Sequence, residues 1–426
     1  MAKKTIETSG LSEVKQEDKK RWWEIAFIWA GSVCCVPALM VGGIITTGLT
    51  FSQAFIAMMI AYGICVFMMI LMSVQSTDLG VPTVVAVSGA FGKKGSSYVI
   101  SAIISFCFIC WFGFQAALCG EAFAGILNMF GIPLPGLLST ILWGAVMCIT
   151  AVVGINLIKW LNVISIPALI LILAYAMIVV FRDPASAQAI RDYVPPTSMS
   201  MVVAVGSVLG GFSAGSVLSG DTTRYCKSRK DVIISSIVGV IPMGVGTLLA
   251  GGILAIHSGA LGMDTSSIVS MLTSIGSPIL GMLVLVLATW TTNVSNAYSA
   301  GFALLNLTGA KDEKRTTMTL IAGIVGTLLA IFGIANYLNG FLNILSVTIP
   351  PVAGVAVMDY YVKHKANPAS WKPVEGINLA GLISWLAGAA FALALPNLLI
   401  PALNSVVIAC VGYLALYPVF YKKEAA

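Results

Sequence analysis

The sequence predicts an all-α integral membrane protein with twelve transmembrane helices. Of the 426 residues, 58% are hydrophobic and only 9% are charged, which is more apolar surface than the core of a water-soluble domain buries. The apolar residues fall into runs of about 20, the length at which a helix crosses the hydrocarbon layer of a bilayer. The positive charges gather in alternate connections between these runs, as is typical of multi-pass membrane proteins.

The twelve predicted spans follow one another along almost the whole chain. They cover residues 24–47, 52–73, 98–129, 135–155, 159–181, 200–221, 232–257, 276–308, 317–334, 338–361, 376–395 and 399–420.

Two of these spans, the first and the sixth, contain residues that weaken a helix. Glycine, two cysteines and proline follow one another at residues 31–37, and four glycines fall within residues 206–215. Such residues free backbone groups from the helix, which is tolerated at membrane depth only around a cavity or binding site. Interrupted helices at corresponding positions of two halves indicate the binding site of a secondary transporter. The sequence therefore predicts helix breaks at both places and a ligand site in mid-membrane.

The charges in the connections predict the orientation of the chain. Basic residues precede the first span and follow spans two, four, six, eight, ten and twelve, at Lys3, Lys4, Lys15, Lys19, Lys20, Arg21, Lys93, Lys94, Lys159, Arg224, Lys227, Arg229, Lys230, Lys311, Lys314, Arg315, Lys363, Lys365, Lys372, Lys422 and Lys423. Only Arg182 and Arg191 fall on the other side. The positive-inside rule then places both termini in the cytoplasm and the protein in the plasma membrane. The net charge of +6 reflects this bias and predicts no nucleic-acid partner.

The two ends of the chain are polar. Residues 1–21 lack the apolar core and cleavage site of a signal peptide, so we expect a flexible cytoplasmic tail. Residues 421–426 are predicted to form a short cytoplasmic C-terminal tail.

Signatures of enzymes and pumps are missing from the sequence. There is no phosphate-binding G-x-x-x-x-G-K-[ST] motif, so the sequence shows no ATP-binding site that could drive a pump. The histidines, His257 and His364, lie far apart, and the nine cysteines lack the spacing of a zinc or disulfide site. The sequence predicts neither an enzyme nor a bound cofactor.

Three clusters combine aromatic and uncharged polar residues within predicted spans. Trp111 and Gln115 are four residues apart in the third span and therefore share one helix face. Phe212 follows two glycines in the sixth span, so its ring and the exposed backbone beside it could contact the same ligand. The eighth span carries Thr291, Thr292 and Asn293 without any charge. Together they predict a site for a flat, neutral, polar ligand.

At this point the chain resembles the nucleobase:cation symporters, a family that includes cytosine permeases, hydantoin transporters, and allantoin, uracil and purine permeases. The bacterial cytosine permeases look closest. The resemblance runs through most of the spans and is carried by residues 111–113 (WFG), 221–225 (DTTRY), 290–293 (WTTN), 300–301 (AG), 306–309 (NLTG), 349–354 (IPPVAG) and 359–361 (DYY).

The resemblance implies a LeuT-type architecture. Helices one to five, within residues 22–181, and helices six to ten, within residues 200–361, would form two inverted repeats, with residues 376–420 appended as helices eleven and twelve. The bundle of helices one, two, six and seven would rock against helices three, four, eight and nine to give alternating access. The oligomeric state is not implied.

The resemblance also implies sodium as the coupling ion. The sodium site would use the backbone carbonyls of Gly31, Cys34 and Ala288 and the hydroxyls of Thr291 and Thr292. This is physically sensible, because a hard cation accepts several neutral oxygens in place of a carboxylate.

Proton coupling stays open at this stage. A proton needs a base to carry it, and none falls within the implied sodium site. Glu121 and Asp221 are the acids that the sequence places inside the protein. Glu121 fits a gate, an unusual packing residue or a proton carrier.

For the substrate, the resemblance implies a heterocycle stacked between Trp111 and Phe212. Gln115 and Asn293 each offer a hydrogen-bond donor and an acceptor to the edge of the ring, and backbone near Gly211 and Ser213 would complete the pairing.

Departures from the family pattern leave the substrate open. Cytosine permeases carry glutamine and asparagine where this chain has Phe108 and Ala288, and Gln115 follows the hydantoin transporter pattern instead. The asparagine of that subgroup is replaced by Ala297, with Asn296 beside it. Cytosine is the leading expectation, and purine, uracil, hydantoin, allantoin or a vitamin pyrimidine are the alternatives. From other classes, a ligand-gated channel or sensor is the rival, and an intramembrane hydrolase lacks a visible nucleophile.

Overall fold

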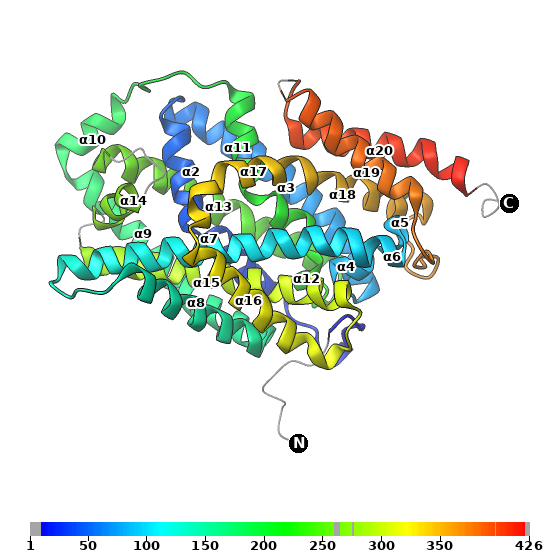
Figure 1. The fold of residues 1–426 in the computed structure, drawn as a ribbon. Helices are drawn as coiled ribbons and strands as arrows, with labels where there is room; N and C mark the ends of the chain where they lie inside the picture. The colour runs from blue at the N-terminus through cyan, green and yellow to red at the C-terminus, as the bar shows by residue number, and fades with distance from the viewer. Residues whose placement is uncertain (1–9, 260–264, 275–276, 397, 422–426) are drawn as a thin grey trace.

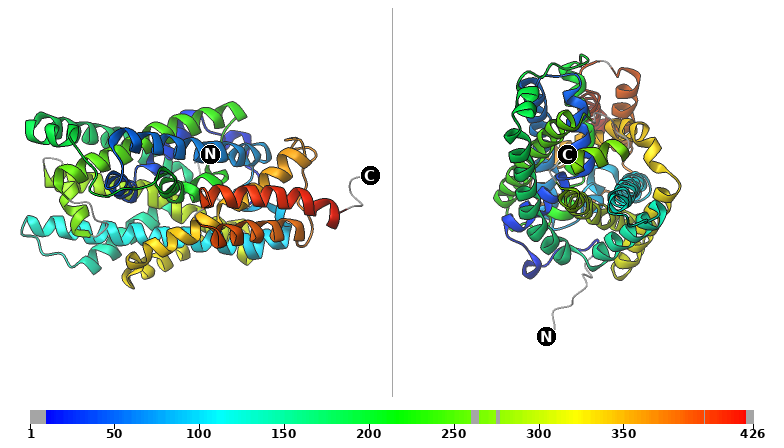
Figure 2. Two further views of the ribbon diagram at one scale, coloured as in Figure 1. Left: turned by 90° about the horizontal axis from the view of Figure 1, so that it is seen from above. Right: turned by 90° about the vertical axis from the view of Figure 1, so that its left-hand side faces the viewer.

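A computed structural model describes residues 10–259, 265–274, 277–396 and 398–421 of the chain. The described residues are almost entirely helical, with one isolated β-bridge between Lys20 and Cys226. The long helices run in a broadly common direction, so that one view of the molecule looks along many of their axes (Figure 1, Figure 2). Residues 1–9 of the predicted N-terminal tail and residues 422–426 of the C-terminal tail lie outside the described residues.

The longer helices have the following bounds. They are α1 (Trp22–Val33), α2 (Val36–Thr46), α3 (Phe51–Leu79), α7 (Ser101–Met129), α8 (Gly136–Val153), α9 (Ile155–Arg182), α11 (Met201–Val217), α13 (Arg229–Ser258), α15 (Pro278–Thr308), α16 (Arg315–Ile331), α17 (Leu338–Thr348), α19 (Leu379–Ala394) and α20 (Pro401–Phe420).

Shorter helices connect them. They are η1 (Gln16–Asp18), α4 (Thr83–Ala86), α5 (Ser88–Phe91), α6 (Lys93–Gly95), η2 (Ser96–Ile100), α10 (Pro184–Arg191), α12 (Gly220–Thr223), α14 (Thr265–Thr273), η3 (Asp312–Lys314), η4 (Ile334–Tyr337), α18 (Pro350–Val357) and η5 (Met358–Lys363).

The prediction of an all-helical membrane protein is confirmed. In the described part of the chain, ten helical segments are long and apolar enough to span a bilayer, and counting the bent pair α1 and α2 as one span gives eleven. The predicted span at 376–395 corresponds to α19, which has 16 residues. At 1.5 Å per residue that helix falls short of a hydrocarbon layer of about 30 Å. It packs along α20 at the edge of the molecule (Figure 1).

The predicted break in the first span is present. Helix α1 ends at Val33, α2 begins at Val36, and the two axes differ by 57°. Pro37 is the second residue of α2, a position where its missing amide hydrogen breaks no helical bond. Cys34 and Cys35 therefore carry the turn.

The predicted break at residues 206–215 of the sixth span is wrong. Helix α11 runs unbroken from Met201 to Val217, and the interruption comes later, at Leu218 and Ser219, before α12. An added Cβ at Gly211 would meet nothing within 4 Å, and one at Gly215 would lie 2.5 Å from the Phe212 ring. These glycines make space on the helix surface, and a helix tolerates each at a cost of about 1 kcal/mol.

Helices α2 and α13 cross at close range because each presents glycine to the other. A Cβ at Gly42 would lie 1.9 Å from the Leu248 carbonyl oxygen, and one at Gly251 would lie 2.0 Å from that of Leu39. The absence of side chains lets the two backbones touch, as in small-residue contacts between membrane helices. This crossing fixes the second half of the broken first span.

Residues 10–21 are not the flexible tail that the sequence predicts. The Val14 side chain is buried and its amide donates to the Gly80 carbonyl at 2.9 Å. The Asp312 carboxylate accepts from the amides of Leu11 and Ser12 at 3.0 and 3.2 Å. The segment lacks an apolar helix pattern, but these backbone bonds hold it across the ends of α3 and α15.

The same segment is also tied to the connection after α12. The Lys20 amide donates to the Tyr225 carbonyl at 2.7 Å, and the Lys19 ammonium donates to the Arg224 carbonyl at 2.7 Å. Burial lowers the pKa of the Lys19 amine and raises the pKa of the Cys226 thiol to about 12. Both groups sit in an interior-like environment rather than in a solvated loop.

Candidate functional site

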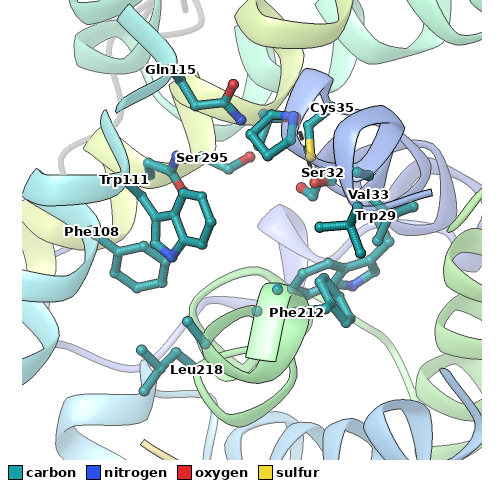
Figure 3. A pocket seen from close by; sticks show the side chains of 18 of the residues that line it. Trp29, Ser32, Val33, Cys35, Phe108, Trp111, Gln115, Phe212, Leu218 and Ser295 are labelled. Atoms are coloured by element: carbon teal, nitrogen blue, oxygen red, sulfur yellow. Dashed lines mark hydrogen bonds between the residues drawn. The ribbon is translucent and has the colours of Figure 1, made fainter. Parts of the chain in front are cut away.

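A cavity of about 100 Å³ lies beside the break between α1 and α2. Side chains from α3, α7, α11, α12, α13, α15 and α17 complete its walls. Figure 3 shows the side of the cavity formed by α7 and that formed by α1 and α11. Its lining is mainly apolar and aromatic with a few polar groups, the usual make-up of a small-molecule site. The interrupted first span thus borders the cavity, as its glycine and proline predict.

Trp111 of α7 forms one wall of the cavity. Its indole packs edge-on against Phe114 and Phe341, with ring centroids 6.2 and 5.5 Å apart. Edge-to-face contacts of this kind hold an aromatic ring in one orientation. The flat face of an immobilised ring is a platform on which a planar ligand can stack.

Phe212 of α11 stands on the opposite side of the cavity (Figure 3). It contacts Trp29 of α1 edge-on at 6.4 Å and Tyr62 of α3 at 5.9 Å. Gly215, one turn later, leaves the space that the Phe212 ring occupies. Gly211 also lines the cavity. Trp29 is a pocket residue that the sequence reasoning missed, because a single tryptophan within the first apolar span gave no separate signal of a site.

Gln115 brings an amide to the cavity one turn after Trp111. Its side chain is 1% exposed, and its Oε1 atom has no hydrogen-bond partner among the described residues. A buried acceptor without a partner costs about 1–3 kcal/mol. Because Gln115 lines the cavity, a ligand that donates a hydrogen bond would recover that cost.

The side chains of Asn293 and Ser213 do not line the cavity; this differs from the prediction for the Asn293 amide, whereas the prediction for Ser213 concerned its backbone. The Asn293 amide donates to the Phe112 carbonyl at 3.1 Å, and the Ser213 hydroxyl turns back to the Gly210 carbonyl at 3.3 Å. Neither residue is part of the lining, whereas Asn296 is.

The helical period explains the exchange of one asparagine for another. Thr292, Ser295, Asn296 and Ser299 line the cavity and follow the i, i+3, i+4, i+7 spacing of one helix face. Asn293 is rotated about 100° from Thr292. Its side chain instead joins α15 to α7, and it accepts from Asn296 at 3.1 Å.

Four of the five residues predicted to bind sodium, Gly31, Ala288, Thr291 and Thr292, come together between α1 and α15. The Thr292 hydroxyl lies 3.0 Å from the Gly31 carbonyl oxygen and 2.9 Å from that of Ala288. The Thr291 hydroxyl lies 3.3 and 3.2 Å from the same two oxygens. Cys34 is the buried residue that directly follows α1. Two hydroxyls and two carbonyls therefore face one another across the first break.

Asn162 of α9 adds an oxygen beside this cluster that the sequence reasoning missed. Its side chain is fully buried, its amide nitrogen donates to Ile158 at 2.8 Å, and its Oδ1 atom has no partner among the described residues. A Cβ at Gly31 would lie 1.6 Å from this Oδ1 and 3.2 Å from the Thr291 Cβ. Gly31 is therefore required for the approach of Asn162. A lone asparagine in an apolar span gave no signal that it packs against the first break.

Acidic side chains are not part of either cluster. In the described residues no three His, Cys, Asp or Glu side chains come together. Glu121 lies on an exposed side of α7, and Asp221 is buried and accepts from the Thr83 amide at 3.0 Å. A cation at the first break would thus be held by neutral oxygens.

The chain is similar to known permeases over almost its whole length. A family model described as "Permease for cytosine/purines, uracil, thiamine, allantoin" matches residues 13–417. The cytosine permease of Escherichia coli (strain K12) is 26% identical over 418 residues, covering 97% of this chain and 95% of that protein. The hydantoin permease of Microbacterium maritypicum is 25% identical over 404 residues, covering 88% and 80%.

Solved structures share the fold. Mhp1, a nucleobase-cation-symport-1 family transporter in a closed conformation with bromovinylhydantoin bound, superposes with a TM-score of 0.81 at 21% identity, covering 98% of this chain and 96% of that chain. A Na+-coupled sialic acid symporter in a substrate-bound outward-open state gives a TM-score of 0.66 at 15% identity, covering 94% and 90%.

Proposed function

This chain belongs to the family of permeases for cytosine/purines, uracil, thiamine and allantoin, and from that premise we propose that it imports a one-ring nucleobase, cytosine first, by sodium symport. It is a multi-pass membrane transporter and not an enzyme. The sodium coupling and the choice of substrate are the proposed parts. Both termini are proposed to face the cytoplasm, as the positive charges predict.

The observation that carries the proposal is the position of Thr292 in both clusters. Its side chain lines the aromatic cavity, and its hydroxyl contacts the Gly31 and Ala288 carbonyls of the oxygen cluster. A sodium ion there would draw α1 and α15 together and set the wall that the substrate touches. Each ligand would then favour the same conformation, which is how two bound species become coupled.

The sodium site is proposed to use the carbonyls of Gly31, Cys34 and Ala288 with the hydroxyls of Thr291 and Thr292. The two hydroxyls donate to the carbonyls. Sodium would take the place of these hydrogens and bind the same oxygens, a neutral coordination shell of the kind that selects hard cations.

The substrate is proposed to stack between Trp111 and Phe212, with Gln115 and the backbone near Gly211 at its edge. Asn296, which lines the cavity, is proposed for the role that the sequence-based prediction assigned to Asn293. The unpartnered Gln115 Oε1 calls for a ring N–H or amino group, as cytosine presents. A ring that offers no donor here would leave the Gln115 acceptor without a hydrogen bond, and the site would therefore reject that ring strongly.

Transport is proposed to proceed by alternating access of two inverted repeats, residues 22–181 and 200–361, with residues 376–420 appended. The bundle of the first, second, sixth and seventh spans would rock against the third, fourth, eighth and ninth. The cation cluster joins α1 of the moving bundle to α15 of the static part, so sodium release would free the bundle to move.

A thermal-shift screen of the purified protein tests the proposal directly. Nucleobases, hydantoin and allantoin are added in sodium chloride or in potassium chloride, and a ligand that binds only the folded protein raises its melting temperature. We expect cytosine to stabilise the protein in sodium and much less in potassium. Stabilisation that is equal in both salts would contradict sodium coupling, and a response to another ring alone would reassign the substrate.

Uptake into proteoliposomes separates a symporter from a channel. We expect radiolabelled substrate to accumulate above its outside concentration while an inward sodium gradient exists, and to leak out when the gradient collapses. A channel would equilibrate substrate without ever concentrating it. Accumulation that follows a proton gradient without sodium would support the proton-coupled alternative instead.

A further inference from the structure

A second cavity, of about 720 Å³, lies away from the substrate site between α1, α9 and α13. It is an open groove lined almost wholly by apolar side chains, with Trp22 and Trp23 at the start of α1 among them. The described lining contains one hydroxyl, Thr247, which donates to the Met243 carbonyl of its own helix at 2.7 Å. The groove therefore offers nothing to a polar solute.

The sequence of the three helices explains why a gap remains there. Helices α9 and α13 each contain an internal proline, Pro167 and Pro242, which removes a helical hydrogen bond and bends a helix. Small residues then leave the space unfilled: a Cβ at Gly246 would meet nothing within 4 Å. Lower in the same helix, Gly239 packs tightly against α1, since its Cβ would lie 2.6 Å from the Ala26 carbonyl oxygen. Ala26 and Gly239 both belong to the lining, so this close contact forms part of the groove wall.

Exposed side chains on the rim show that the groove opens outward. Ile170 of α9 and Val238 of α13 are 49% and 50% exposed and belong to its lining. In a protein that spans a bilayer, an outward-facing apolar groove at this depth is filled by hydrocarbon rather than by water. Trp22, 37% exposed, stands where tryptophans anchor a span at the interface.

Positive charge gathers at the tryptophan end of the groove. The parallel bridge pairs Lys20 with Cys226, so the exposed Arg21 and Lys227 follow at neighbouring positions. Lys230, also exposed, is the second residue of α13, with Asp231 beside it. The acid in the first turn of α1, Glu24, pairs with Lys159 at 2.9 Å and so does not offset this charge. Basic residues next to a groove between membrane helices attract anionic lipid head groups.

We propose that this groove binds one anionic phospholipid of the surrounding bilayer. An acyl chain lies along Gly246 between α9 and α13, and the phosphate lies at the interface near Arg21 and Lys227. The ligand is distinct from the transported heterocycle, and the proposal does not depend on which heterocycle is carried.

Native mass spectrometry of the intact protein tests the lipid site. The purified chain is loaded with phosphatidylglycerol or with phosphatidylcholine of identical acyl chains and is then delipidated stepwise with detergent. We expect the unmodified protein to retain one phosphatidylglycerol through a wash that removes phosphatidylcholine, with about tenfold tighter retention. Equal loss of both lipids at the same step would overturn the proposal.

Two variants and one control separate the apolar part of the site from the charged part. Gly246→Trp fills the groove, so the retained lipid should be lost; Gly63→Trp, where a Cβ also meets open space on an exposed face of α3, should retain it. Arg21→Gln with Lys227→Gln leaves the packing intact and should abolish the preference for phosphatidylglycerol. Lipid retained by Gly246→Trp as by the unmodified protein would refute the site.

The heterocycle-induced thermal shift serves as the folding check for each variant. A variant that keeps this shift and loses its lipid supports the proposal. If Gly246→Trp fails to fold, the double variant Arg21→Gln with Lys227→Gln provides the test. An unchanged preference of that variant for phosphatidylglycerol counts against the site. If no heterocycle shifts the unmodified protein either, the proposed substrate has failed, while the lipid measurement stands on its own.

Discussion

At the scale of single residues, the two aromatic walls of the cavity are held by different neighbours. Trp111 packs on Phe114 and Phe341, whereas Phe212 packs on Trp29 and Tyr62. Each ring is therefore pre-oriented without the ligand, and stacking should cost little side-chain entropy. The walls belong to separate helices, so a bound ring would bridge α7 and α11.

Replacement of either wall should strongly weaken heterocycle binding. Trp111→Ala and Phe212→Ala each remove a stacking face worth about 0.5–1.5 kcal/mol beyond its buried area, so we expect at least a roughly tenfold loss of affinity. The ligand-induced thermal shift measures it. Trp160→Ala, which alters an exposed indole on α9, is the control and should bind normally. Unchanged affinity in the first two variants would exclude the stacking geometry.

The hydroxyl of Thr292 should set the sodium requirement. Thr292→Ala removes one proposed cation ligand while leaving the aromatic walls, so the sodium concentration for half-maximal stabilisation should rise about tenfold or more. Thr292→Ser should restore it. Thr289→Ala is the matched control, because the Thr289 hydroxyl bonds back to the Leu285 and Val286 carbonyls of its own helix, at 2.6 and 3.3 Å, and touches neither Gly31 nor Ala288 in these bonds. A sodium response equal in Thr292→Ala and Thr289→Ala would remove Thr292 from the site.

At the scale of helices, two glycines on α13 that look alike in sequence have different surroundings. Gly251 touches the Leu39 carbonyl of α2, and Gly246 opens onto the apolar groove. The close crossing at Gly251 holds α2 beside α13, and α2 carries the second half of the broken span. The bend of 57° at the cavity thus depends on a contact about one turn away.

Alanine at these two glycines should have opposite effects on stability. Gly251→Ala forces the backbones of α2 and α13 apart and should cost about 1–3 kcal/mol. Gly246→Ala fits without contact and improves helix propensity by up to about 1 kcal/mol, so its melting temperature should stay equal or rise. Thermal unfolding of both variants in one detergent checks the pair. Equal melting temperatures would show that the crossing at Gly251 relaxes freely.

At the scale of the whole molecule, residues 10–21 connect parts of the chain that are far apart in sequence. Asp312 holds Leu11 and Ser12, while the Arg224 guanidinium donates to the Gly10 carbonyl at 2.9 Å. The segment therefore bridges the end of α15 and the connection after α12. In the proposed rocking mechanism these two regions belong to different bodies.

Loss of the Asp312 carboxylate should release this segment. Asp312→Ala removes the acceptor for Leu11 and for the amide and hydroxyl of Ser12, the last at 2.6 Å. We expect faster tryptic cleavage at Lys15, whose side chain is already 77% exposed, because proteolysis follows local opening. Glu313→Ala, one residue away, should leave the rate unchanged. An unaltered cleavage rate in Asp312→Ala would mean that the remaining hydrogen bonds of residues 10–21 hold the segment in place without Asp312.

The sequence by itself determined the class of the molecule, the position of nearly every span and the break at Cys34 and Cys35. These follow from local properties: apolar run length, glycine and proline content, and the placement of lysine and arginine. It also named Trp111, Gln115 and Phe212, which line one cavity, although their role in binding stays a prediction.

Only the tertiary structure decided where the sixth span is interrupted, which asparagine of α15 faces the cavity and what residues 10–21 contact. The glycines of α11 read as a break, but the helix continues through them: Gly215 leaves room for the Phe212 ring of the same helix, and Gly211 lines the cavity. Asn293 and Asn296 differ by less than one turn, and the packing of α7 and α1 against α15 fixes which of them points inward. The rotation of a helix about its axis is set by the helices that pack against it. The residue pattern within that helix alone does not predict this rotation.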